Sequence, residues 1–240
     1  MLRTIARSTL KALHIDITRN MRYDRMASRI FQKCITPGTN CIDIGAHKGE
    51  MLAEFLKLSP SGHHFAFEPI PVMYKELARR YSQKAQVYPY ALAAQSGKAT
   101  FNYVRNAPAY SGLRKRQYAV ASPDIEEIQV EVRTLDELIP SNLAIGLIKI
   151  DVEGAEYEVI SGGIDTISRN KPYLLFEFGK GASDYYGTDP GEFFDLFTET
   201  LGMRVRSLPA FLSNGPAYTR EGFIHCYDSI TEYYFIAAPH

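Results

Sequence analysis

A short apolar run that ends in a glycine turn is the feature that most constrains this fold. Residues 41–44 read Cys-Ile-Asp-Ile and continue into Gly-Ala-His-Lys-Gly, and a helical pattern follows over about 49–57. This order predicts a buried strand, a tight turn and a helix. A second apolar run, 64–67, ends on Glu68. In an open α/β sheet the two strand ends face one crevice, where nucleoside-bearing ligands bind.

Charge indicates which nucleoside ligand the crevice accepts. A dinucleotide site needs three close glycines so that the backbone can approach a pyrophosphate. Here the spacing is Asp-x-Gly-x-x-x-Gly, and Asp43 would direct a negative charge into the pocket. That charge repels a pyrophosphate and suits the ammonium of an amino acid. S-adenosylmethionine carries such an ammonium, together with a ribose diol for Glu68. We therefore predict S-adenosylmethionine as the cofactor, against the alternative of an ordinary βα turn with an exposed acid.

Composition places few further limits on function. The chain of 240 residues is most simply one domain, and its net charge of zero gives no indication of a nucleic-acid partner. Residues 1–33 nevertheless hold eight basic and two acidic residues. Their pattern predicts a helix with one basic face. Because the apolar stripe of this helix is short, we favour a helix that caps the domain over one that lies on a membrane surface through residues 1–20.

Cysteine content and hydropathy predict the compartment. The three cysteines lack the spacing of a metal site and are odd in number, which favours reduced thiols. No apolar run approaches the roughly 18 residues of a membrane span, and the N-terminus lacks the apolar centre of a signal peptide. We expect a cytoplasmic protein.

From residue 41 onward, apolar runs alternate with helical patterns, which predicts βαβ units and a parallel sheet. We expect strands at 41–44, 64–67, 86–90, 144–150 and 173–178, and helices over 71–81, 134–138 (capped), from 155 and over 193–201. Extended segments are expected at 99–104 and 129–133, and a pairing of 203–207 with 233–237. The polar loop 105–123 contains the basic residues 114–116, which we interpret as a solvated face.

A second acidic constellation follows the strand at 144–150. Residues 147–156 read Leu-Ile-Lys-Ile-Asp-Val-Glu-Gly-Ala-Glu. Asp151, at the carboxyl end of the strand, should open into the ligand crevice. Glu156 is expected to favour the start of the next helix or to bind a nearby backbone group.

Four segments in this order resemble the FkbM family of S-adenosylmethionine-dependent methyltransferases: 43–49, Phe67-Glu68-Pro69, 132–138 and 148–156. The resemblance spans residues 41 to about 178, although members often carry Asn where this chain has His47. It implies a Rossmann-like, doubly wound α/β fold with a mostly parallel seven-stranded sheet and an antiparallel last strand. It also implies O-methylation of a hydroxyl on a sugar, glycan, glycolipid or secondary metabolite.

The resemblance assigns roles to individual residues. The cofactor would contact Asp43, Gly45, Ala46, His47, Gly49, Glu68, Pro69, Ala91, Leu92 and Asp151, with residues 90–92 beside the adenine. Asp151 is the first candidate for the general base, followed by Glu153 and Glu177, and then by His47 and His225. These acids have the oxygen ligands that a hard cation requires, but nothing in their spacing demands one, so we assign no metal.

The acceptor and the domain boundaries complete the prediction. We expect a small-molecule or glycan acceptor and no nucleic acid, with residues 1–35 as an N-terminal helical cap and 36–240 as the methyltransferase domain. An acceptor cleft could be lined by Tyr185, Tyr186, Tyr218 and Tyr227, whereas Phe193, Phe194 and Phe197 are expected in the core. Two alternatives stay open: a nucleotide-sugar or dinucleotide enzyme on a related sheet, and a catalytically silent cofactor-binding module.

Overall fold

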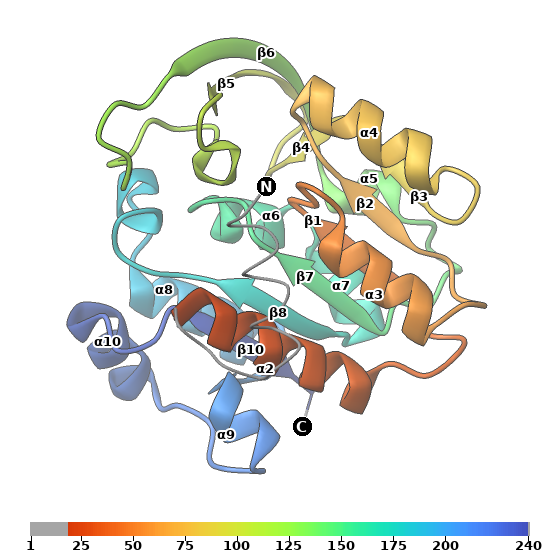
Figure 1. The fold of residues 1–240 in the computed structure, drawn as a ribbon. Helices are drawn as coiled ribbons and strands as arrows, with labels where there is room; N and C mark the ends of the chain where they lie inside the picture. The colour runs from red at the N-terminus through yellow and green to blue at the C-terminus, as the bar shows by residue number, and fades with distance from the viewer. Residues whose placement is uncertain (1–18, 240) are drawn as a thin grey trace.

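The computed structural model of this chain describes residues 19–239 and has one central sheet with helices on both faces (Figure 1). The seven strands lie in the order β3-β2-β1-β7-β8-β10-β9. Their bounds are β1 (Cys41–Ile44), β2 (Phe65–Phe67), β3 (Gln86–Tyr88), β7 (Leu147–Ile150), β8 (Tyr173–Glu177), β9 (Arg204–Ser207) and β10 (Tyr234–Ala238). Strand β10 runs antiparallel to β8 and β9, whereas the other pairings are parallel. This confirms the expected α/β fold and the pairing of 203–207 with 233–237.

The helices cover the sheet in two layers. Their bounds are α2 (Arg19–Cys34), α3 (Glu50–Leu58), α4 (Pro71–Tyr81), α5 (Leu135–Leu138), α6 (Glu156–Ser161), α7 (Ile164–Asn170), α8 (Pro190–Asp195), α9 (Leu208–Leu212) and α10 (Arg220–Ser229). Side chains of β1 alternate between the faces, so that Cys41 packs with α2, α3 and α9 while Ile42 and Ile44 pack with α5 to α8 and α10. The first half of the predicted N-terminal helix, 1–18, lies outside the described residues.

Three local predictions can be compared with the structure. The side chain of Thr134 accepts a hydrogen bond from the Glu137 N–H, so the predicted capped helix is confirmed. Phe193, Phe194 and Phe197 are buried in the main core, also as predicted. The predicted helix over 193–201 is instead α8 continued by a π-helical turn, Leu196–Thr200. No helix between residues 19 and 239 has both the length and the apolar character needed to cross a membrane.

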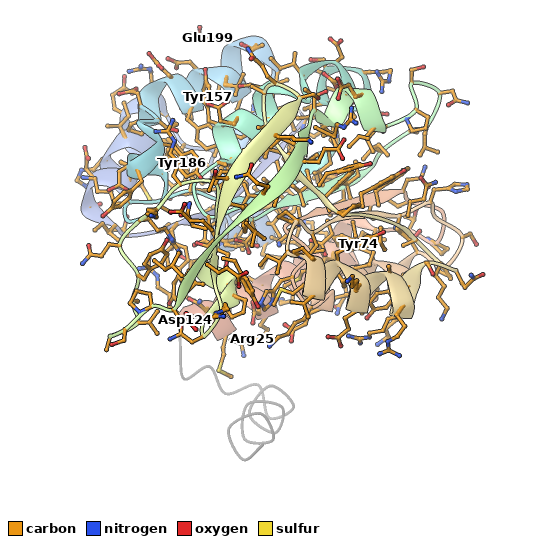
Figure 2. All side chains as sticks on the ribbon, turned by 90° about the horizontal axis from the view of Figure 1, so that it is seen from above. Arg25, Tyr74, Asp124, Tyr157, Tyr186 and Glu199 are labelled. Atoms are coloured by element: carbon orange, nitrogen blue, oxygen red, sulfur yellow. The ribbon has the colours of Figure 1, made fainter. Side chains whose placement is uncertain are left out.

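The predicted single strand over 86–90 is wrong, because the segment forms two strands that belong to different sheets. Residues 86–88 pair with β2, but Pro89 has no N–H to donate, and the chain then leaves the main sheet. Residues 90–92 become β4, which pairs with β6 (Ile125–Arg133); β6 also pairs with β5 (Gly97–Val104). Figure 2 looks down on this second sheet, whose strands β5 and β6 lie across the molecule. The connection between β5 and β6 covers the pocket at the ends of the parallel strands.

Candidate active site

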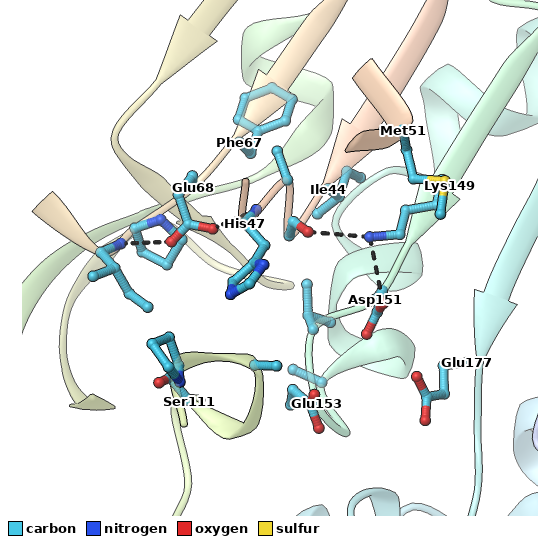
Figure 3. A pocket seen from close by; sticks show the side chains of 18 of the residues that line it. Ile44, His47, Met51, Phe67, Glu68, Ser111, Lys149, Asp151, Glu153 and Glu177 are labelled. Atoms are coloured by element: carbon cyan, nitrogen blue, oxygen red, sulfur yellow. Dashed lines mark hydrogen bonds and ion pairs between the residues drawn. The ribbon is translucent and has the colours of Figure 1, made fainter. Parts of the chain in front are cut away.

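A pocket of about 220 Å³ lies where the parallel strands β1, β2, β7 and β8 end. The strand ends contribute the glycine turn after β1, Glu68 after β2, Asp151 after β7 and Glu177 of β8. Its roof comes from the β5–β6 connection, which contributes Pro108, Ala109, Ser111 and Leu113, and its outer wall from α2. Figure 3 shows Glu68 and Phe67 toward one end, Asp151, Glu153 and Glu177 toward the other, and His47 between Glu68 and Asp151.

The glycine turn after β1 is held by both neighbouring strands. The N–H groups of Gly45 and Ala46 each donate to the Phe67 carbonyl at 3.0 Å, and the Asp151 N–H donates to the Ile44 carbonyl at 3.1 Å. Gly45 has φ +77°, and a Cβ there would lie 1.9 Å from the Asp151 carbonyl oxygen. Only glycine therefore permits the β7 loop to pass this close. Gly45, Ala46 and His47 all line the pocket, where the sequence placed them.

Gly49 has a packing role at the start of α3. It is not among the pocket-lining residues. It precedes α3 with φ +75°, and a Cβ there would lie 2.6 Å from Leu77 Cδ2 and 2.9 Å from Tyr81 Cε2. Its lack of a side chain lets α3 pack closely against α4, and the cofactor contact at Gly49 stays a prediction.

Glu68 is buried and fixes the conformation of the turn. One carboxylate oxygen accepts the His47 N–H at 2.8 Å, and the other accepts the Ile70 N–H at 2.9 Å. Burial raises the pKa of Glu68 to about 7, against the lowering effect of these two hydrogen bonds. Glu68 and Pro69 both line the pocket. Each carboxylate oxygen of Glu68 can still accept a further hydrogen bond. The carboxylate is thus preorganised to accept further hydroxyl donors.

Asp43 lies beneath the pocket and not on its wall. Its side chain is fully buried, and the Lys149 ammonium approaches its carboxylate at 3.5 Å. The same ammonium lies 3.4 Å from Asp151 and donates to the Gly45 carbonyl at 3.1 Å. Burial raises the pKa of Asp43, although the charge of Lys149 opposes that effect. Lys149 lines the pocket and Asp43 does not, and the direct contact of Asp43 with a ligand ammonium stays a prediction.

Lys149 is the functional residue that sequence reasoning missed. It lies on the buried strand β7, between the apolar residues Ile148 and Ile150. A lysine is rarely buried without a partner. Its position within an apolar strand, two residues from Asp151, was a signal that could have identified it.

The three predicted catalytic carboxylates, Asp151, Glu153 and Glu177, do lie together. All three line the pocket. Of the two acids on the loop after β7, Asp151 is the more accessible, with 32% of its side chain exposed against 17% for Glu153. Glu153 forms an ion pair with Arg116, yet burial and the nearby Asp151 raise the pKa of Glu153 to about 8. Burial, followed by the charges of Asp151 and Glu153, raises the pKa of Glu177 well above its usual range.

Glu156 binds the loop backbone, as predicted, accepting N–H groups from Val152 at 3.0 Å and Gly154 at 3.3 Å. It therefore shapes the turn that carries Asp151 and Glu153. Among residues 19–239, no three acidic, histidine or cysteine side chains are grouped so that they could hold a metal ion.

An apolar wall completes the end near Glu68. It consists of Phe67, Ile70, Tyr90, Ala91, Leu92 and Phe101, and so includes the three residues predicted beside an adenine. The rings of Phe67 and Tyr88 stack at 5.3 Å, which supports this wall from behind. A flat aromatic base would find a matching apolar surface here.

The basic residues 114–116 only partly form the predicted solvated face. Lys115 is exposed and pairs with Glu127. Arg116 is 10% exposed, pairs with Glu153 and donates to the Gly181 carbonyl at 3.1 Å. Arg114 donates to the Tyr185 carbonyl at 3.3 Å. These contacts fasten the β5–β6 connection over the pocket.

The aromatic residues at the pocket are not those predicted. Tyr185, Tyr186, Tyr218 and Tyr227 do not line it, nor does His225. Tyr23 of α2 and Tyr233 and Tyr234 at β10 line it instead. His47 projects into the pocket with its Nε2 buried and without a hydrogen-bond partner among the described residues, and burial lowers its pKa.

Comparisons with known proteins agree with this geometry. The family model described as "Methyltransferase FkbM domain" matches residues 43–205. The 2-O-methyltransferase NoeI of Sinorhizobium fredii is 25% identical over 169 residues, which cover 64% of this chain and 68% of NoeI. The solved structure of methyltransferase FkbM from Methylobacillus flagellatus is similar with a TM-score of 0.51 and 17% identity. That match covers 85% of this chain, which spans only 44% of the solved one.

Proposed function

This chain belongs to the FkbM methyltransferase family, and we propose that it uses S-adenosylmethionine to methylate a hydroxyl group of a sugar or other small polyhydroxylated acceptor. The observation that carries the proposal is the pairing of Glu68 with the glycine turn in one pocket. The turn presents backbone groups to the pocket, and the carboxylate of Glu68, which accepts the His47 N–H, keeps lone pairs for further donors.

The residues present fit this cofactor. Glu68 can accept both ribose hydroxyls while it retains its backbone hydrogen bonds. Ala91, Leu92 and Phe101 supply an apolar surface for the adenine. The buried, unpartnered Nε2 of His47 can form a hydrogen bond with a polar group of the ligand. Bound in this way, S-adenosylmethionine supplies an electrophilic methyl group on a sulfonium.

The protein contributes position and proton transfer. Methyl transfer is an in-line displacement, so holding the acceptor oxygen in line supplies much of the rate enhancement. Asp151 is the favoured general base, because it is the more accessible loop carboxylate and lies on the His47 side of Glu177. Lys149 fixes its orientation at 3.4 Å. Glu153 and Glu177, whose pKa values are raised, are better suited to donate a hydrogen bond to another acceptor oxygen.

O-methylation is favoured over transfer to another atom by the similarity to NoeI, which is itself a 2-O-methyltransferase. A dinucleotide enzyme is disfavoured, because Glu50 and Asp151 line the pocket while Lys149 is already paired with Asp43 and Asp151. A pyrophosphate in this position would meet repulsive charge.

A transfer assay tests the proposal. The protein is incubated with S-adenosylmethionine carrying a labelled methyl group and a panel of glycans and glycosides, and the label is located by mass spectrometry. We expect labelled methyl ether on a hydroxyl. Calorimetric binding of NAD in place of S-adenosylhomocysteine would contradict the proposal.

A further inference from the structure

One end of the pocket is dominated by acidic side chains. Asp24 of α2, Asp151, Glu153 and Glu177 line this end together with the tyrosines at 233 and 234. Glu177 is in register with Tyr234 on the neighbouring strand, which places β10 beside β8 at this end. Burial, followed by the charges of Glu177 and Asp24, raises the pKa of the Tyr233 hydroxyl.

The buried cations at this end are already paired. Lys149 is shared between Asp43 and Asp151 and also donates to a backbone carbonyl. Arg116 is engaged with Glu153 and the Gly181 carbonyl. Among the described lining residues, the remaining lysine is Lys48, which is exposed and lies near Glu50 in the turn after β1. Within residues 19–239, the two buried cations beside the acids, Lys149 and Arg116, are thus both engaged before a ligand anion arrives.

The raised pKa of Glu177 reports the electrostatic environment at this end of the pocket. Burial and three neighbouring carboxylates raise its pKa well above the usual range, so its neutral form is favoured. A negative charge brought in by a ligand would meet the same desolvation and the same neighbours. The raised pKa of Glu177 follows from the same burial and the same carboxylates that line this end of the pocket.

We propose that the acid-rich end is a charge filter that admits uncharged polyhydroxylated acceptors and rejects those carrying a carboxylate or phosphate next to the reacting hydroxyl. The inference rests on the proposed function and specifies its acceptor class. Of the four acids at this end, Asp151, Glu153 and Glu177 lie within the segment 43–205 that the family model matches. Asp24 of α2 and the two tyrosines at 233 and 234 lie outside it.

The test compares matched pairs of sugars on protein saturated with S-adenosylhomocysteine. The probes are the methyl glycosides of glucose, galactose and mannose and their corresponding uronates, with binding measured by NMR titration. For at least one pair we expect the neutral glycoside to bind and its uronate to bind about tenfold or more weakly, as like-charge contacts imply. A uronate that binds as tightly as its neutral partner, or no binding by any neutral glycoside, would overturn the inference.

Two variants separate local from overall charge. Asn20 lines the pocket and is exposed, so Asn20→Lys adds a cation at the entrance. Gln32 is exposed on the same helix and does not line the pocket, so Gln32→Lys adds the same charge elsewhere. We expect Asn20→Lys to strengthen uronate binding several-fold and Gln32→Lys to leave it unchanged. Equal effects of the two variants would refute a local filter. Failure of S-adenosylhomocysteine to bind the wild type would instead refute the proposed function.

Discussion

The ammonium of Lys149 lies 3.5 Å from the carboxylate of Asp43, and both side chains are buried beneath the turn that follows β1. A buried charge whose partner is removed is strongly destabilising. We predict that Lys149→Met lowers the free energy of unfolding by roughly 3–5 kcal/mol, measured by urea denaturation.

The exposed Lys98 provides a control for loss of a lysine, and Lys98→Met should have almost no effect. Combining Asp43→Asn with Lys149→Met should restore part of the loss, because the unpaired carboxylate is then gone. A Lys149→Met protein as stable as the wild type would show that the pair does not hold the turn.

Glu68 connects the turn to the proposed ribose site. Glu68→Gln places an amide N–H₂ against the backbone N–H of either His47 or Ile70, which are both donors. It also weakens the hydrogen bonds that position 68 could accept from the ribose hydroxyls. We expect S-adenosylhomocysteine to bind about 10–100-fold more weakly, as for hydrogen bonds to a charged group. Calorimetry measures this, with Glu76→Gln on the exposed face of α4 as the control. Unchanged affinity would remove Glu68 from the site.

Asp151 is the proposed general base. We predict that Asp151→Asn lowers kcat by about 10²–10⁴-fold and leaves the binding of S-adenosylhomocysteine intact, because the amide keeps the shape of the side chain. Single-turnover kinetics and calorimetry on the same preparation distinguish these effects. Full activity of the variant would reject Asp151 and transfer the role to Glu153 or Glu177.

The glycine at position 45 is required by both conformation and space. Gly45→Ala would place a methyl group 1.9 Å from the Asp151 carbonyl, at φ +77°. The positive φ alone costs about 1 kcal/mol or more, so we expect larger destabilisation and loss of cofactor binding, measured by thermal unfolding and calorimetry. Gly97→Ala, which meets no atom within 4 Å, should change neither. Similar behaviour of the two variants would contradict the role assigned to the turn.

Stability should also depend on pH. Burial raises the pKa of Glu68 and of Glu156 from 4.5 to about 7. The folded protein therefore retains protons that the unfolded chain has already released, and stability falls as the pH rises from about 5 to about 8. Urea denaturation across this range measures the slope, which Glu68→Gln should make shallower. Stability that increases with pH would contradict these shifts.

The parts of the site that follow one another along the chain could be predicted from the sequence. The turn after β1, Glu68 and Asp151 each continue directly from a strand, and parallel strands bring their carboxyl ends together. Asp43 does not line the pocket, because alternation along β1 sends its side chain to the α2 and α3 face, where Lys149 meets it. Gly49 was assigned to the ligand, and helix packing also explains its conformation.

The remaining parts depend on contacts between distant segments. Tyr23 and Tyr234 are separated by most of the chain, yet their rings stack at 5.6 Å at the pocket wall. Arg116 reaches Glu153 only because β5 and β6 form a separate sheet after Pro89. No local periodicity encodes such contacts, since they arise from how complete elements pack.

The central claim is that this pocket binds an adenosyl compound through Glu68 and the turn after β1. A crystal structure of the protein with saturating S-adenosylhomocysteine tests it most directly. We predict the ribose hydroxyls on Glu68, the adenine beside Ala91 and Leu92, and the sulfur directed toward Asp151. A pocket that stays empty under these conditions, or one that takes up a diphosphate compound instead, would contradict the account.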